Sequence, residues 1–431
     1  MNEKINDSKS LEGASAGYSI TVCLKIENKP GRFSKVISTI AESEGSIAEI
    51  ELLYSDYHTN IREVTINCKS SSHSKEVRDA VDKIDFVEIL KERDDTFYMH
   101  ESGKLNVTAC SHLKTNDELA RAYTPGVARV CTHIHENPKD VHKYTIKANT
   151  IAVISDGSAV LGLGNIGAEA SIPVMEGKAV LFKQFAGLNA FPICLDTQDT
   201  EEIIKTIKHL APIFGGINLE DIAAPRCFEI EKRLSEELDI PVFHDDQHGT
   251  ACVVLAGLLN ALKLADKNPA DIKVVVNGFG AGGVACTRML LNAGIKNIIP
   301  CDSAGIVYRG RKERMNPVKD ELVELTNPEN LKGSVAGVIT RDMVQSMAEK
   351  PIVFALANPV PEILPEEIRD IAFVIATGRS DYANQVNNVL CFPGIFKGAL
   401  SVGATDITGN MKVAAAEAIA AAIDVEDLTP E

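Results

Sequence analysis

The chain has 431 residues, 45% of them hydrophobic, and a formal net charge of −16 from 44 Lys and Arg against 60 Asp and Glu. That length predicts about three domains, each large enough to bury its own core. So acidic a surface argues against proteins that bind nucleic acid or an anionic membrane through non-specific charge. No apolar run approaches the roughly 18 residues of a membrane span, and ten cysteines without a CxxC pair indicate reduced thiols. We therefore expect a cytoplasmic enzyme with no nucleic-acid or membrane partner.

The N-terminal segment starts with a polar stretch, residues 1–17, which lacks the apolar core of a secretory signal and is predicted to be a disordered tail. From residue 18 to residue 95, strand-like alternation and helical periodicity follow one another. The predicted elements are a strand at 18–28, a helix at 32–45, strands at 46–55 and 62–70, a helix at 74–84 and a strand at 85–93. This βαββαβ order is the ferredoxin-like arrangement.

The turn between the first strand and the first helix, E-N-K-P-G-R-F at 27–33, resembles the ligand loop of ACT domains. The resemblance implies that residues 18–95 form a regulatory domain that binds a small-molecule effector. A purely structural dimerisation domain is the alternative.

A dinucleotide-binding unit is predicted around V-V-V-N-G-F-G-A-G-G, because this G-x-G-x-x-G spacing follows an apolar strand and opens a helix. The cofactor pyrophosphate would lie on the loop residues Gly278, Gly280, Ala281, Gly282 and Gly283. After the next strand, Asp302 is placed to hold the adenosine ribose hydroxyls, which favours NAD over NADP; an Asp that caps a turn is the alternative. Nearby Arg309, Arg311 and Lys312 act against that preference.

Carboxylates and one lysine form the second group of candidate residues. Glu220 and Asp221 end one strand-like run, and Asp245 and Asp246 end another. Carboxylates at strand ends of an α/β sheet suit Mg²⁺ or Mn²⁺, whereas zinc is disfavoured because no thiol accompanies the nearby histidines. Lys178 lies in the apolar segment PVMEGKAVLF, where desolvation would lower its pKa and make it a usable base; a surface lysine is the alternative.

Seven blocks in order resemble the bacterial malic enzymes, from about residue 105 to the C-terminus. They are YTPGVA, SDGSAVLGLGNIG, PVMEGKAVLFKQFAG, FGGINLEDIAAPRCFEIE, IPVFHDDQHGTA, FALANPVPEI and ATGRSDYANQVNNVLCFPGIFKGAL. The resemblance implies oxidative decarboxylation of L-malate to pyruvate and CO₂ with NAD or NADP and with Mn²⁺ or Mg²⁺. It also implies a homodimer or a larger homo-oligomer.

Roles follow from the resemblance, position by position. Lys178 would be the general base at the malate hydroxyl, Tyr123 would protonate the enolpyruvate carbon, and Asp245 would orient Lys178 or a ligand. The implied metal ligands are Glu220, Asp221 and Asp246. The implied substrate-binding residues are Asn358, Asn387 and Asn388.

The chain departs from the family pattern at two places. Asn165 stands where members usually have Asp. After TNPENLKGS the chain also lacks roughly fifteen residues, which in the family supply a helix end and a strand like G-A-D-V-F-I-G-V-S. A parallel sheet without that strand keeps an unpaired gap, or PIVFALANP moves over to close it. Either the dinucleotide domain of this protein is altered, or the sequence omits a flexible piece. Cofactor affinity is the property that this difference affects most.

We thus expect an α/β chain of three folded parts. They are an ACT-like domain at 18–95, a substrate and metal domain at 100–250 and a Rossmann-like NAD domain at 251–390, with a helical segment at 391–431 that packs on the substrate domain. Two alternatives to a malic enzyme stay open: a malolactic-type lyase that releases lactate, and a catalytically weak regulator that binds a metabolite.

Overall fold

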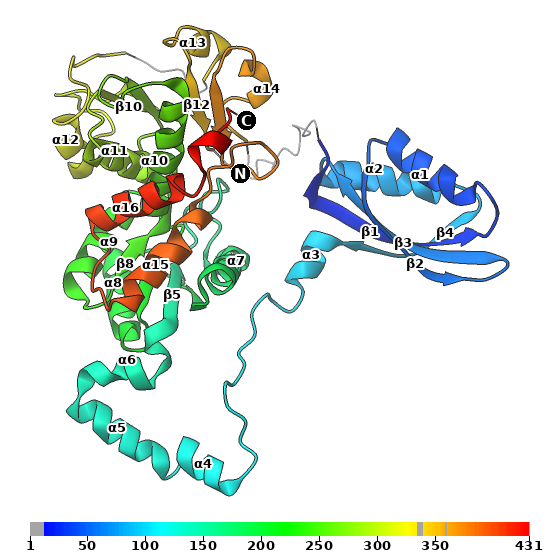
Figure 1. Ribbon diagram of the computed structural model, residues 1–431, viewed down its shortest axis with the longest axis horizontal. Coiled ribbons are helices and arrows are strands. Elements are labelled where there is room, and N and C mark those ends of the chain that lie inside the picture. The colour runs from blue at the N-terminus through cyan, green and yellow to red at the C-terminus, as the bar shows by residue number, and fades with distance from the viewer. Residues whose placement is uncertain (1–12, 334–338, 358–359, 431) are drawn as a thin grey trace. The chain divides into compact units, whose positions relative to one another are not determined.

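The computed structural model describes residues 13–430 except 334–338 and 358–359, and it divides into two compact units. The N-terminal unit comprises residues 1–104 and the C-terminal unit residues 105–431 (Figure 1). Most of the predicted tail, residues 1–12, lies outside the described residues, and the first strand already begins at Ser15.

The N-terminal unit is a four-stranded antiparallel sheet with two helices on one face (Figure 1). Its elements are β1 (Ser15–Glu27), α1 (Arg32–Glu42), β2 (Ser46–Ser55), β3 (Thr59–Cys68), α2 (Ser71–Asp82), β4 (Val87–Asp94) and α3 (Asp95–His100). Alternate residues of β1, such as Val22 and Leu24, are buried in one core with Val36 of α1 and Val77 of α2. The strand order β2-β3-β1-β4 confirms the predicted ferredoxin-like arrangement.

The C-terminal unit begins with a helical arm and a parallel sheet of order β6-β5-β7-β8. The arm comprises α4 (Asn116–Ala122) and α5 (Gly126–Glu136), followed by α6 (Val141–Tyr144). The strands are β5 (Thr150–Ser155), β6 (Asn189–Cys194), β7 (Gly216–Leu219) and β8 (Val242–His244), and the helices between them are α7 (Ala168–Ala186), α8 (Thr200–Leu210) and α9 (Arg226–Glu237).

Both faces of this sheet are covered, as its apolar strands require. Ile151 and Val153 of β5 pack in one core with Phe182 of α7, and Ala152 and Ile154 pack in another with the apolar faces of α8 and α9. Every residue of β5 is buried. Because the strands are parallel, their carboxyl ends meet at one edge, where ligands bind in such folds.

The long helix α10 (Asp245–Ala265) follows β8 and connects this sheet to the next. In the part of the chain that the structure describes, α10 is the one helix whose length and composition would allow it to cross a membrane. Of its most apolar stretch of 18 residues, 56% is buried inside the protein. It packs against α11 (Ala281–Asn292) and α16 (Gly409–Ala420). These contacts make α10 the central core helix of the unit.

The region that follows α10 holds two small sheets. One has the order β11-β10-β9, from β9 (Val274–Asn277), β10 (Ile298–Asp302) and β11 (Gly305–Ile306); the other pairs β12 (Ile352–Ala355) with β13 (Val374–Thr377). Short helices accompany them: α12 (Pro317–Val323), α13 (Arg341–Gln345) and α14 (Pro365–Ile368).

A gap separates the two sheets. Among the described residues, β9 pairs only with β10, and β12 pairs only with β13. Val275, in the middle of β9, is 59% exposed, although a central strand of a parallel sheet is normally buried. Of the two alternatives given by the sequence, the described strands therefore show the unpaired gap, because β12 does not pair with β9.

The C-terminal segment returns to the first sheet. Phe392 and Phe396 of α15 (Phe392–Ser401) lie with their ring centroids 4.8 and 5.6 Å from that of Phe182 on α7. Short 3-10 turns complete the unit: Pro138–Asp140, Ile146–Asn149, Ala211–Ile213, η4 (Asn388–Leu390) and Val425–Asp427.

Candidate active site

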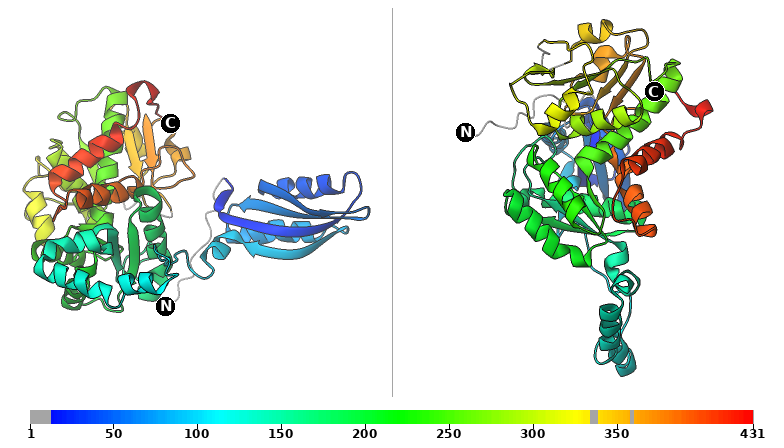
Figure 2. Two further views of the ribbon diagram at one scale, coloured as in Figure 1. Left: turned by 60° about the horizontal axis from the view of Figure 1, so that its bottom comes forward. Right: turned by 90° about the vertical axis from the view of Figure 1, so that its left-hand side faces the viewer.

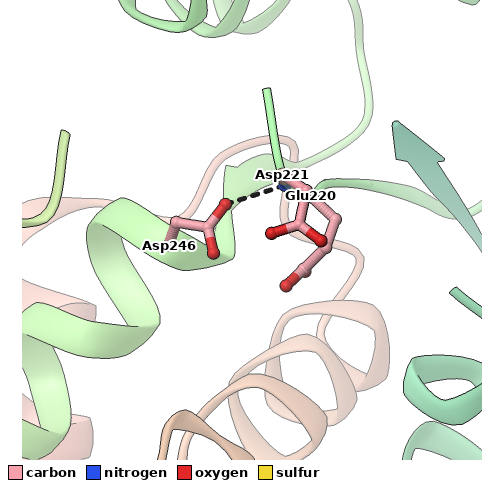
Figure 3. A group of neighbouring side chains, drawn as sticks. All are labelled: Glu220, Asp221 and Asp246. Atoms are coloured by element: carbon pink, nitrogen blue, oxygen red, sulfur yellow. Dashed lines mark hydrogen bonds between the residues drawn. The ribbon is translucent and has the colours of Figure 1, made fainter. Parts of the chain in front are cut away.

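Three carboxylates gather where β7 and β8 end side by side. Glu220 and Asp221 follow β7 directly, and Asp246 lies in the first turn of α10. One oxygen of each of these three residues lies within 4.8 Å of the others (Figure 3). Strand ends that are far apart in sequence thus bring together the three residues expected to bind a metal.

Local contacts fix the orientation of this group. Asp221 has a left-handed backbone with φ 55, and its N–H donates to Asp246 Oδ2 over 2.8 Å (Figure 3). Asn218, buried in β7, donates from Nδ2 to Glu220 Oε2 over 2.9 Å. Both acids after β7 are therefore positioned before any ligand is present.

Lys178 lies in the middle of α7 and is buried, so it is not a surface lysine. Its ammonium is 2.6 Å from Asp245 Oδ2 and 2.9 Å from Glu220 Oε1. Burial alone lowers the pKa of Lys178, but these two carboxylates raise it more, so its pKa lies above the ordinary value. The expectation that the pKa of Lys178 is lowered is therefore wrong when only the protein side chains surround it.

The cluster of Glu220, Asp221 and Asp246, with Asp245 beside it, has more carboxylates than the single ammonium of Lys178 can neutralise. Burial, followed by the charge of Asp246, raises the pKa of Asp221 to about 8, and burial raises that of Glu220 well above its usual range. Among the described residues, Asp221 Oδ2 is buried without a hydrogen-bond partner. A hard divalent cation would satisfy this oxygen, so the residues fit Mn²⁺ or Mg²⁺. The donors of the group are all oxygens, which disfavours zinc.

The glycine-rich loop lies between β9 and α11, as predicted. Gly278 has φ +113, a conformation that side chains rarely adopt. A Cβ on Gly283 would lie 2.0 Å from the carbonyl oxygen of Gly278. A Cβ on Gly280 would meet nothing within 4 Å, which leaves room for a ligand to approach, and α11 begins at Ala281. Gly282 packs close to the backbone of Asp246, so the loop lies next to the carboxylate group.

Asp302 ends β10, but it does not present a free carboxylate. Its Oδ1 accepts from Arg311 and from the Ala304 N–H over 3.0 and 2.9 Å, and its Oδ2 accepts from Arg311 and from Lys319. Burial raises its pKa, but Arg311 and Lys319 lower it further, to about 2. Two cations thus offset the charge of Asp302, which weakens the argument that it repels a 2′-phosphate.

Two family models match the chain: the malic enzyme N-terminal domain over residues 102–235 and the malic enzyme NAD binding domain over residues 307–431. An NAD-dependent malic enzyme from Geobacillus stearothermophilus is 53% identical over 428 residues, which cover 96% of this chain and 89% of that relative. The chain belongs to the malic enzyme family.

Other relatives agree with this assignment. A bifunctional malic/malolactic enzyme from Bacillus subtilis is 53% identical over 357 residues, which cover 79% of this chain and 87% of the relative. The crystal structure of an NAD-dependent malic enzyme from Thermotoga maritima, 48% identical, superposes with a TM-score of 0.75 over 79% of this chain and 95% of that one. The expected family and its Rossmann-like NAD-binding domain are therefore confirmed.

The remaining residues expected from the malic enzyme resemblance are only partly brought together. Asn388 donates from Nδ2 to Asp245 Oδ2, so η4 is tied to the Lys178 side of the site. Asn387 instead accepts the Val389 N–H over 3.0 Å and caps η4. Asn358 lies outside the described residues. Tyr123 lies on the arm, where it is 68% exposed.

Several residues that shape the site were not found from the sequence. Asn218 precedes Glu220 by two positions, so its side chain lies on the same side of the strand, and that spacing was the available signal. Asp156 is buried after β5 and accepts from Arg226 over 2.7 Å, which ties the loops after β5 and β7 together. The partnership of Asp156 and Arg226 depends on strand order, which the local sequence does not reveal.

Proposed function

We propose that this chain catalyses the oxidative decarboxylation of L-malate to pyruvate and CO₂, dependent on a divalent metal and on NAD⁺, with NADP⁺ as the less favoured cofactor. The observation that carries the proposal is the carboxylate group joined to Lys178 at the shared ends of β7 and β8. The names of the two NAD-dependent relatives support the cofactor.

In this mechanism Lys178 accepts the proton of the malate C2 hydroxyl, and NAD⁺ at the glycine-rich loop would be the acceptor of the hydride. Glu220, Asp221 and Asp246 would hold a divalent cation, which would supply Lewis acidity toward that hydroxyl. Glu220 would then be shared between the cation and Lys178, and the pKa of Lys178 would fall toward that of a base. Asp245 holds the ammonium over 2.6 Å and is itself held by Asn388, so the base is fixed in place. The amide at the N-terminal end of α11 would receive the cofactor pyrophosphate.

Protonation of the enolpyruvate carbon is assigned to Tyr123, which requires a second copy of the chain. In the described residues no hydrogen bond joins Tyr123 to Lys178 or to the carboxylates, and neither α4 nor α5 has a buried residue. Figure 1 and the right panel of Figure 2 show this arm apart from the rest of its unit. Leu119 of α4, Tyr123 at its C-terminal end, and Val127 and Val130 of α5 are all exposed. We infer a homodimer or a larger homo-oligomer in which the arm of one copy completes the site of another.

Complementation tests this assignment. Tyr123→Phe and Lys178→Ala are each expected to be nearly inactive. Mixing the two variants after dissociation should restore up to about a quarter of the wild-type rate, because half of the dimers are mixed and each mixed dimer has one intact site. A mixture that stays inactive while mixed dimers form contradicts the assignment.

We further infer that the N-terminal unit is an ACT-like domain that regulates turnover through a small-molecule effector. A cavity of about 650 Å³ lies at the loop that resembled the ACT ligand loop, and both signs of charge line it, including Glu27, Arg32 and Glu88. Arg32 lies 3.1 Å from Glu27 and stacks 4.1 Å from the centre of the Phe86 ring. An amino-acid-sized zwitterion suits such a lining. An amino acid that alters turnover of the full-length chain should lose its effect in Arg32→Ala but not in Lys35→Ala, a matched exposed position on α1.

A malolactic activity is the second candidate, because the Bacillus subtilis relative is named as bifunctional. One experiment separates the products. Purified protein with L-malate and Mn²⁺ is given NAD⁺ or NADP⁺, absorbance at 340 nm is followed, and pyruvate and lactate are assayed. Formation of reduced cofactor in an amount that matches pyruvate supports the proposal. Formation of lactate without net reduction of the cofactor supports the malolactic lyase. If neither product forms, the catalytically weak regulator is favoured.

We also propose a division of the C-terminal unit into domains. Residues 100–250 form the substrate and metal domain, residues 251–390 form the NAD domain, and residues 391–431 form a segment that returns to the substrate domain. The cytoplasm is the proposed compartment, because the ten cysteines of the chain are free thiols.

A further inference from the structure

The corner between β8 and α10 must aim two neighbouring acids in different directions. Asp245 turns to Lys178, and Asp246 turns to Asp221. Helix α10 begins at this corner, yet its N-cap residue, His244, makes no side-chain capping hydrogen bond. The geometry of the corner therefore depends on a group from elsewhere in the fold.

Glu231 supplies that group from α9. Its Oε1 accepts the backbone N–H of His244 over 3.0 Å, and its Oε2 accepts from Gln247 Nε2 over 3.1 Å. Its Oε1 also lies 2.8 Å from His248 Nε2. The carboxylate of Glu231 thus contacts His244 before the two acids and Gln247 and His248 after them. In the described residues it makes no hydrogen bond to Asp245 or Asp246 themselves.

The environment of Glu231 favours a fixed, charged carboxylate. Its side chain is 12% exposed, and His248 and the half-buried Lys412 of α16 face it. A negative charge at the N-terminus of α10 also complements the helix dipole and satisfies one of the amides that a helix start leaves unpaired. An interior position that only filled space would carry an apolar side chain at lower cost.

We propose that Glu231 is a positioning residue for the metal site: it holds the β8–α10 corner so that Asp246 faces the cation position and Asp245 faces Lys178. The inference rests on the proposed metal-dependent function. Groups that orient metal ligands from behind typically change metal affinity by about 10- to 100-fold when they are altered.

The test is a direct Mn²⁺ titration of the full-length chain, with free Mn²⁺ followed by electron paramagnetic resonance and without turnover. Glu231→Gln keeps the shape of the side chain but removes its charge and one acceptor. Glu229→Gln is the matched control, since Glu229 lies on the same helix, is 58% exposed and pairs with Arg233. We expect Mn²⁺ to bind about 10- to 100-fold more weakly to Glu231→Gln, with the control and the affinity for NAD⁺ unchanged.

Titrations are made at a temperature where circular dichroism shows each variant fully folded, because a residue that only stabilises the fold would not change the Mn²⁺ affinity of folded protein. Should Glu231→Gln fail to fold, Gln247→Met removes one of the same contacts and should weaken Mn²⁺ binding in the same direction. Equal Mn²⁺ affinity in the wild type and the folded variant overturns the positioning role alone. A wild-type chain that binds no Mn²⁺ overturns the proposed function and this inference with it.

Discussion

Replacing Lys178 by Met tests the centre of the proposed mechanism, because it removes the ammonium and keeps most of the side-chain volume. The two carboxylate oxygens at 2.6 and 2.9 Å each attract the ammonium by about 6 kcal/mol at an effective dielectric constant near 20, before desolvation is subtracted. The net loss of folding free energy on removing one partner of such a buried group is about 3–5 kcal/mol.

Turnover and metal affinity should move in opposite directions in this variant. Loss of a general base lowers kcat about 10²- to 10⁴-fold, which corresponds to about 2.7–5.5 kcal/mol of activation free energy. Mn²⁺ should bind more tightly, because Glu220 loses its competing ammonium and the cation loses a repulsive neighbour.

The assay combines initial rates at saturating malate with a Mn²⁺ titration in the absence of substrate. Lys183→Met is the matched control, since Lys183 is exposed on the same helix and bonds only to Asn189 among the contacts that the structure records for its ammonium. Unchanged kcat in Lys178→Met would refute the base assignment. Weaker Mn²⁺ binding in a folded variant would refute the electrostatic account of the site.

Three further outcomes are expected. Asp246→Asn should raise the Mn²⁺ concentration needed for half-maximal activity at least about 10-fold, and an unaltered titration would remove Asp246 from the ligand set. Gly283→Ala forces its Cβ against the Gly278 carbonyl, and this overpacking costs about 1–3 kcal/mol. NAD⁺ should therefore bind about 10-fold more weakly by calorimetry, while Mn²⁺ binding is unchanged. Equal NAD⁺ affinity would argue against the assignment of this loop to the cofactor. Asp302 has a pKa lowered to about 2, so its ion pairs stabilise the fold above pH 4 and lose that effect as the pH falls toward 2. The melting temperatures of wild type and Asp302→Asn should therefore differ most at pH 7 and converge below pH 4, and a difference that does not depend on pH would contradict this.

Strand ends and glycine spacing were the parts of the site that the sequence could predict. The acids after β7 and β8 follow apolar runs whose carboxyl ends meet in any parallel sheet, and the loop of Gly278 to Gly283 has a fixed spacing. Such patterns are local, and the fold only has to bring them to one edge.

Electrostatic partners could not be predicted in the same way. Whether burial or charge decides the pKa of Lys178 depends on Asp245, which lies 67 positions away and reaches it only through the sheet order. The salt bridge of Asp302 to Lys319 depends likewise on where α12 packs, since 17 positions separate the two residues. Periodicity and composition carry no information about such pairs.

The gap in the nucleotide-binding region has a consequence for cooperativity. The strands β12 and β13 share no hydrogen-bonded ladder with β9 among the described residues, and they have their own small core around Val353 and Ile368. Regions with few shared contacts open at lower free energy than the whole molecule. Amide hydrogen exchange should therefore be faster in β12 and β13 than in the fully buried β5.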